Sequence, residues 1–153
     1  MEIEDLYHDY NLILQMIIPN NIKVRLLREL FEASDNPWRV VGITESALRK
    51  FEEHEFRKES GMGIQRAHLN NRNNAFLEML NTEFQNSDEW WDFYYERDQT
   101  ILGLSSENRG IENGLVNYIE IDENLGLFRS NRISWKHSRA EMDFLTNLRI
   151  NLI

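Results

Sequence analysis

Cysteine is absent from this chain of 153 residues. The absence excludes disulfide bonds, zinc sites with thiolate ligands and cysteine nucleophiles together. Proline is scarce, and Pro19 and Pro37 each fall between periodic segments, where proline marks a boundary between elements. No run approaches the roughly 18 apolar residues that a membrane-spanning helix needs. The acidic N-terminus also lacks the basic and then apolar pattern of a secretory signal. We therefore expect a cytoplasmic protein with no membrane partner.

Positive charge is also in short supply. The chain has 17 Lys and Arg against 26 Asp and Glu, a formal charge of −9. Such a chain gains nothing overall from approaching nucleic acid, so any contact with phosphate must be local. One segment, residues 128–139, carries basic residues and no acid. Its four cations are Arg129, Arg132, Lys136 and Arg139.

Apolar residues make up 41% of the chain and aromatic residues 11%, which is enough to fill a core and excludes a disordered chain. Apolar side chains recur at helical spacing over residues 3–17 and 22–31, with Pro19 between them. This pattern predicts an antiparallel helical hairpin over residues 1–35. We expect the hairpin to belong to the same domain as an α+β body over residues 36–153.

The body alternates short strand patterns with helical ones. Ser138 and Glu141 form a capping box before a C-terminal helix, and Thr44 is a predicted N-cap. A turn over 122–126 predicts a hairpin between residues 116–121 and a return strand that begins at Leu127 and Phe128. The expected fold is a helix-rich α+β single domain with a small antiparallel sheet. Its strands are expected at residues 38–41, 64–69, 100–104, 116–121, 127–128 and 133–135.

Two segments stand apart as candidates for chemistry. Residues 61–72 place His68 at the end of a predicted strand, two positions after Arg66. Nearly forty residues later, a second predicted strand leads into a capped turn that carries Glu107 and Asn108. The sequence has no His-x-x-x-His pair, no phosphate-binding loop and no Gly-x-Ser-x-Gly motif.

A histidine at a strand end, then a second strand, then a short helix bearing Asn resembles the HNH-type nucleases, which have the ββα-metal fold. The run Gln65-Arg66-Ala67-His68 is similar to the Asp-Arg-Gly-His motif of the related non-specific nucleases. The resemblance implies that His68 is the general base that activates water, and that Arg66 acts beside it. It further implies that Asn108, with Glu107 beside it, holds one Mg²⁺ or Mn²⁺ ion on the scissile phosphate. The alternative metal ligands are Asn81 and Asn86.

The sequence therefore predicts a metal-dependent, HNH-like endonuclease that hydrolyses phosphodiester bonds. Its expected contacts to nucleic acid are Arg72, Arg129, Arg132, Lys136 and Arg139. The first alternative is a non-catalytic interaction or inhibitor protein. It would bind a protein through the N-terminal helices, with a homodimer as one form, or through the aromatic block at residues 90–95. The second alternative is an acidic mimic of nucleic acid. The nuclease requires His68, Asn108 and an arginine to converge, whereas the interaction protein requires an exposed apolar patch.

Overall fold

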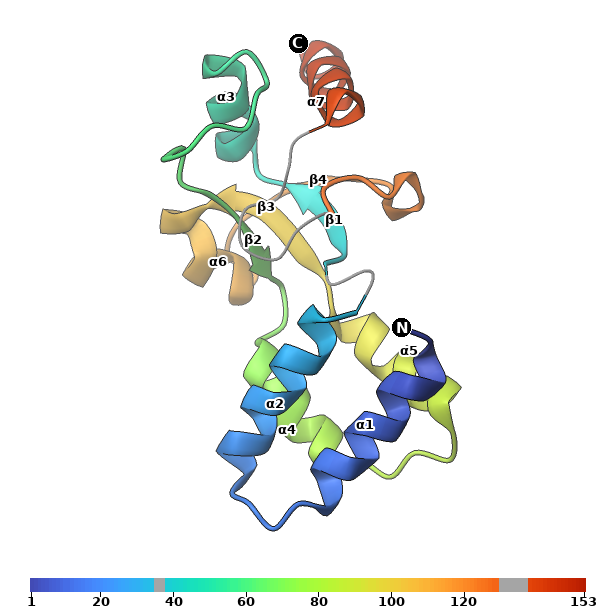
Figure 1. The fold of residues 1–153 in the computed structure, drawn as a ribbon. Helices are drawn as coiled ribbons and strands as arrows, with labels where there is room; N and C mark the ends of the chain where they lie inside the picture. Colours follow the sequence, from blue (N-terminus) through green and yellow to red (C-terminus); the bar gives the residue numbers. More distant parts are fainter. Residues whose placement is uncertain (35–37, 130–137) are drawn as a thin grey trace. The chain divides into compact units, whose positions relative to one another are not determined.

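The computed structural model describes residues 1–34, 38–129 and 138–153. The chain divides into two compact units, shown in Figure 1. The first, which we call the helical unit, comprises residues 1–37 and 70–98. The second, the α+β unit, comprises residues 38–69 and 99–153. The N-terminal hairpin thus shares its unit with a segment that lies between two strands of the other unit.

The helical unit contains four helices in the described residues. The predicted hairpin is confirmed as α1 (Ile3–Gln15) and α2 (Asn20–Glu32), and α4 (Arg72–Leu80) and α5 (Ser87–Arg97) complete the unit. Two asparagines begin the second pair, because each side-chain oxygen accepts a backbone N–H of the first turn. Asn71 accepts from Asn74 N at 3.0 Å, and Asn86 accepts from Glu89 N at 2.9 Å.

Aromatic rings fill the core of the helical unit. Phe31 of α2 is fully buried and stacks on Tyr94 of α5, with 3.6 Å between ring centroids. Phe76 of α4 and Trp90 of α5 lie 5.5 and 5.3 Å from the Phe31 ring. Trp90 and Tyr94 come from the aromatic block at residues 90–95, so the block supplies core residues to this unit.

The α+β unit is built on a four-stranded sheet of order β2-β3-β1-β4. Its strands are β1 (Val40–Ile43), β2 (Ile64–His68), β3 (Thr100–Leu104) and β4 (Ile119–Glu120). The pairs β2–β3 and β1–β4 are antiparallel, whereas β1 and β3 run parallel, so the small sheet is mixed. The helix-rich α+β class with its N-terminal hairpin is confirmed.

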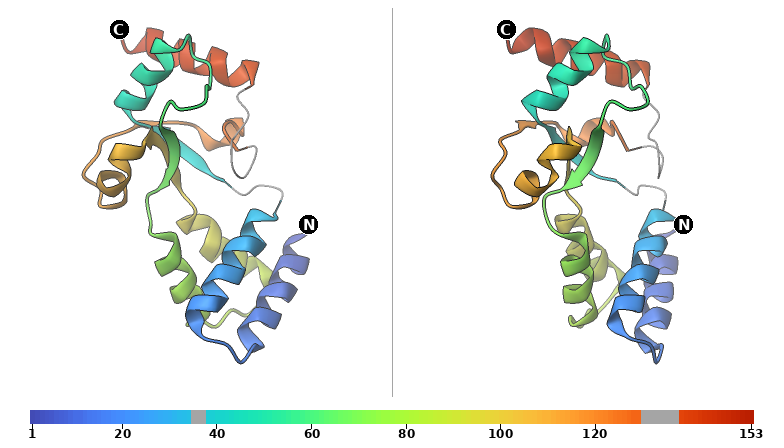
Figure 2. Two further views of the ribbon diagram at one scale, coloured as in Figure 1. Left: turned by 60° about the vertical axis from the view of Figure 1, so that its left-hand side comes forward. Right: turned by 90° about the vertical axis from the view of Figure 1, so that its left-hand side faces the viewer.

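Helices pack on both faces of this sheet, as Figure 2 shows. On one face, α3 (Glu45–Glu53) and α7 (Arg139–Asn151) pack against the three longer strands. On the other face, α6 (Asn108–Glu112) places Ile111 against Ala67 and Ile101. The short 3-10 helices η1 (Ser105–Glu107) and η2 (Glu123–Leu125) complete the unit. The predicted N-cap of α3 and the capping box of α7 are both confirmed.

Three predictions about the strands need correction. The predicted strand 38–41 extends instead over Val40–Ile43 and includes Gly42, where a Cβ would lie 2.4 Å from Tyr118 Cδ2, so that only glycine fits there. The predicted hairpin from 116–121 to a return strand is wrong, since β4 pairs with β1. The predicted return strand at Leu127 and Phe128 is also wrong. Phe128 has a left-handed backbone conformation with φ 62°, and its N–H donates to the Glu141 carboxylate of α7 at 2.9 Å. The predicted extended segment 133–135 lies outside the described residues.

Candidate functional site

Three of the predicted site residues gather around Trp38 in the α+β unit. His68 is the last residue of β2, and its ring centroid lies 5.4 Å from that of Trp38. The Arg66 guanidinium carbon lies 4.5 Å from the centroid of the Trp38 ring. Arg129 Nε donates to the Trp38 carbonyl oxygen at 2.8 Å. The structure therefore brings His68, Arg66 and Arg129 together around Trp38, whereas the nuclease prediction requires Asn108 in the same place.

The two arginines of this cluster also hold the backbone. Arg66 Nη1 donates to the Phe128 carbonyl oxygen at 2.8 Å while its guanidinium covers the Trp38 ring. Arg129 bonds to Trp38 O in the same way. A guanidinium on an aromatic face is stabilised by the ring quadrupole, and each backbone bond fixes a carbonyl that would otherwise need water. These contacts fasten residues 128–129 beside β2.

The predicted metal ligands lie elsewhere in the same unit. Asn108 Nδ2 donates to Gln65 Oε1 at 2.6 Å. One Glu107 carboxylate oxygen accepts from Thr44 Oγ1 and from Leu104 N, each at 2.8 Å. Both side chains therefore hold η1 and the start of α6 in place. Glu107 is a capping carboxylate here, which its position at the third residue of a turn explains.

The register of β2 and β3 shows how far His68 lies from Asn108. β2 and β3 are antiparallel, with Ile64 opposite Leu104 and His68 opposite Thr100. Asn108 follows the end of β3 and bonds to Gln65, so it lies near the start of β2, about 10 Å along the strand from His68. Gln65 and His68 also project from opposite faces, because side chains alternate along a strand. The structure does not bring His68 and Asn108 together. The described residues likewise hold no group of three acidic or histidine side chains able to bind a metal.

The other predicted residues are dispersed. Arg72 lies in the helical unit, where its side chain is 11% exposed and pairs with Glu32 at 3.1 Å. Asn86 caps α5, and Asn81 Nδ2 donates to Leu77 O at 2.8 Å. Arg139 is exposed at the start of α7, 3.8 Å from Asp143. The remaining two, Arg132 and Lys136, lie outside the described residues.

The acidic residues are divided unevenly between the two units. The sequence prediction missed this because it treated the chain as one domain. The helical unit holds 14 of the 26 acidic residues but five of the 17 basic residues, which leaves it at −9. The α+β unit holds 12 of each and is neutral. The whole net charge of the protein thus belongs to the helical unit.

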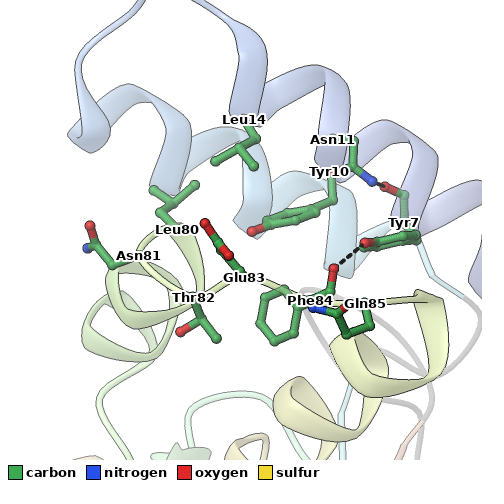
Figure 3. Close-up of a pocket in the computed structure, with 10 residues that line it drawn as sticks. All are labelled: Tyr7, Tyr10, Asn11, Leu14, Leu80, Asn81, Thr82, Glu83, Phe84 and Gln85. Carbon is green, nitrogen blue, oxygen red and sulfur yellow. Dashed lines mark hydrogen bonds between the residues drawn. The ribbon is translucent and has the colours of Figure 1, made fainter.

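The helical unit also has a hollow of about 500 Å³, drawn in Figure 3. One wall is α1, and the other is the end of α4 with the segment that joins it to α5. The apolar part of the lining comes from aromatic rings and two leucines. These residues are Tyr7, Tyr10, Leu14, Leu80 and Phe84.

Tyrosine hydroxyls tie the two walls together. Tyr7 OH donates to Phe84 O at 3.3 Å, and Tyr10 OH donates to Met79 O at 3.0 Å. Burial, with a smaller contribution from Tyr7, raises the pKa of Tyr10 to about 12. The Tyr10 hydroxyl therefore stays protonated and remains a donor at neutral pH. These hydrogen bonds join α1 to the opposite wall, so they hold the two walls of the hollow in place.

Acceptor atoms surround the apolar lining. Asn11 Nδ2 donates to Tyr7 O and Asn81 Nδ2 donates to Leu77 O, both at 2.8 Å. These bonds engage the amide nitrogens, so each Oδ1 is left to accept. Glu83 adds a carboxylate, which Figure 3 shows between Leu80 and Tyr10. Lys23 brings a cation close to this lining, with Nζ donating to Leu14 O at 2.6 Å.

Exposed apolar side chains continue from the hollow. Leu14 lines it and is 37% exposed, and the next apolar residues along the chain are Met16, 46% exposed, and Ile17, which is fully exposed. We call Leu14, Met16 and Ile17 the apolar tip. Leu12 is on the same helix and is 49% exposed, but it does not line the hollow. Sequence periodicity assigned residues 3–17 to one buried helix face, so it missed the tip.

Among the described residues, no helix has the length and apolar character that crossing a membrane requires. No family model matches the chain, and neither a curated protein nor a solved structure matches it.

Proposed function

We propose that this chain is a non-catalytic interaction protein that binds a protein partner through its helical unit. The observation that carries the proposal is the apolar tip beside the hollow, on the unit that holds the whole net charge of −9. Apolar side chains that stay in water cost free energy, which burial against a partner recovers. The acidic charge around them selects partners of opposite sign and speeds their approach.

The same charge argues against two other partners of the helical unit. Nucleic acid would be repelled by a unit with nine excess negative charges, since its backbone is a dense row of phosphates. A homodimer through α1 and α2 would bring two such units into contact and would pay for the repulsion of like charges. A basic protein surface is the partner that fits both the charge and the apolar tip.

Affinity capture from the source cells tests the proposal. The bait variant replaces the apolar tip by Leu14→Asn, Met16→Gln and Ile17→Asn. A matched control replaces two exposed leucines of the α+β unit, Leu115→Asn and Leu125→Asn, which are 81% and 52% exposed. We expect the wild-type and control baits to recover the same partner, identified by mass spectrometry. With the bait well below its Kd, the tip variant should lose about 90% of that partner, which then corresponds to a tenfold loss of affinity.

Circular dichroism of each bait checks that the helices are intact. We expect equal spectra, because substitutions of exposed residues have little effect on stability. The proposal is overturned if the tip variant recovers the same partners as the wild type, or if none of the baits recovers a partner.

Metal-dependent phosphodiester hydrolysis is the second candidate. It is supported by the order of elements in the α+β unit, where an antiparallel pair, β2 and β3, is followed by α6, which packs on both strands. This is the order that the ββα-metal resemblance implies, and His68 ends the first strand of the pair. The candidate ranks second because His68 and Asn108 lie at opposite ends of the pair.

A plasmid-nicking assay decides on this second candidate. We expect supercoiled DNA to stay intact with purified protein in Mg²⁺ or Mn²⁺, because no described carboxamide or carboxylate of the predicted set lies beside His68. Nicking that needs the metal, disappears in His68→Ala and persists in His8→Ala would contradict this expectation and establish the nuclease. His8 is a suitable control because it is an exposed histidine of α1.

A further inference from the structure

We propose that the hollow beside α1 receives an amphipathic helix from the partner, with apolar anchors on one side and Lys or Arg flanking them. This inference rests on the proposed function and names the chemistry of its partner. It is argued from the lining of the hollow, from the acceptors around it and from the charge of the helical unit.

The lining calls for an apolar anchor. Tyr7, Leu14, Leu80 and Phe84 present carbon surface to a space of about 500 Å³. A space of this size is typical of pockets that bury one compact ligand group, and it suits one or two large side chains of a partner. The tyrosine hydroxyls are already engaged with Phe84 O and Met79 O. The two hydroxyls are therefore engaged, and the carbon surface beside them is available to an apolar side chain.

The surroundings of the hollow call for hydrogen-bond donors with positive charge. Asn11 Oδ1, Asn81 Oδ1 and the Glu83 carboxylate are acceptors, and each amide nitrogen already donates to a backbone carbonyl. Lys and Arg carry donors only, and their long apolar stems can lie along the walls while the charged ends reach these oxygens. A basic flank thus pairs with the local acceptors as well as with the charge of the unit.

A helix is the form that presents such a set of side chains. The described part of the helical unit has no strand to offer an edge, so an extended peptide has no backbone to pair with. An amphipathic helix places anchors at i and i+4 on one side. One anchor can enter the hollow while the next covers Met16 and Ile17 of the apolar tip. The result is the helix-in-groove mode of recognition.

A second copy of this chain matches the required apolar anchors and flanking basic residues less well. Besides the apolar tip, it exposes Ile150 of α7 and Leu152 just after that helix, but α7 carries two acids and two bases and has no excess of positive charge. The rest of a second copy is neutral or acidic. The charge complementarity therefore favours a different, basic partner over self-association.

The test uses synthetic helical peptides as probes. The first peptide has Leu on one side and Lys on the other, and a control of the same length has Glu in place of Lys. Fluorescence anisotropy gives the Kd of each peptide for the full chain. Two matched pairs of variants locate the site. Leu14→Asn is compared with Leu12→Asn on the same helix, and Glu83→Gln is compared with Glu29→Gln, an exposed acid of α2 that does not line the hollow.

We expect the Leu/Lys peptide to bind and the Leu/Glu peptide not to bind. Leu14→Asn should weaken the first complex about tenfold, as the loss of one buried leucine contact does. Glu83→Gln should weaken it about threefold, and this effect should shrink in high salt, as exposed ion pairs do. Leu12→Asn and Glu29→Gln should stay within about twofold of the wild type, because they alter no lining group.

Each contrary result overturns a distinct statement. Equal Kd values for Leu14→Asn and Leu12→Asn would remove the hollow as the docking site. Failure of the Leu/Lys peptide to bind, while the capture experiment yields a partner that depends on the apolar tip, would overturn the basic helix and leave the proposed function standing. Concentration-dependent dimerisation in analytical ultracentrifugation, lost in Leu14→Asn, would replace the partner by a second copy.

Discussion

Phe31→Ala is expected to lower the free energy of unfolding by about 3–5 kcal/mol, the usual cost of deleting a buried phenylalanine. Phe31 is fully buried, and its ring stacks on Tyr94 at 3.6 Å and lies 5.5 Å from Phe76 and 5.3 Å from Trp90. These neighbours come from α4 and α5, so one side chain of α2 joins three helices of the unit. Rings so closely packed cannot all move to fill the space that alanine leaves.

Urea unfolding followed by near-ultraviolet circular dichroism measures the effect, because the signal reports the packing of Trp90 and Tyr94. Leu77→Ala on α4 is the matched control, since Leu77 is a large apolar residue of the same unit that is 38% exposed. Its cost should stay below about 1 kcal/mol. A loss for Phe31→Ala no larger than that for Leu77→Ala would show that these rings do not form the core of the helical unit.

Local signals in the sequence predicted most of the elements because their causes are local. Thr44 caps α3 and Ser138 with Glu141 forms the capping box of α7, as expected from side chains that bond to nearby backbone N–H groups. The division into units was not predicted, because its cause is pairing across distance. β2 and β3 are neighbours in the sheet although α4 and α5 lie between them in the chain. No local sequence pattern indicates that α4 and α5 pack with α1 and α2 in the core of the helical unit.

The candidate nuclease site shows the same limit in its geometry. The sequence places His68 at the end of one predicted strand and Asn108 after the next, in a sheet that was expected to be antiparallel. β2 and β3 are antiparallel, so the end of one strand lies opposite the start of the other. His68 faces Thr100, and Asn108 reaches back to Gln65. The residue pattern alone therefore does not show where along the pair the Asn108 side chain comes to lie.

Arg72→Met is expected to lower the free energy of unfolding by about 3 kcal/mol, a value at the low end for removing one partner of a buried ion pair. The sequence predicted that Arg72 contacts phosphate. In the structure its guanidinium is 11% exposed and pairs with Glu32 at 3.1 Å. Burial first, and then the charge of buried Asp98, raise the pKa of Tyr94, and Arg72 acts in the opposite direction. Without the guanidinium, the Glu32 carboxylate would lose its partner in a site that is only partly exposed to water.

The double variant Arg72→Met with Glu32→Gln separates this cause from lost packing. If the unpaired carboxylate dominates, adding Glu32→Gln recovers part of the stability that Arg72→Met removes, and the cycle gives a coupling free energy of about 1–3 kcal/mol. Arg25→Met on α2 is the control, because Arg25 is exposed and should cost less than about 0.5 kcal/mol. Additive losses in the cycle would mean that Arg72 contributes through its contact with Phe76, where the guanidinium carbon lies 5.5 Å from the ring centroid. A double variant less stable than either single variant would contradict the ion-pair account, since Glu32→Gln removes the carboxylate that Arg72→Met leaves without its partner.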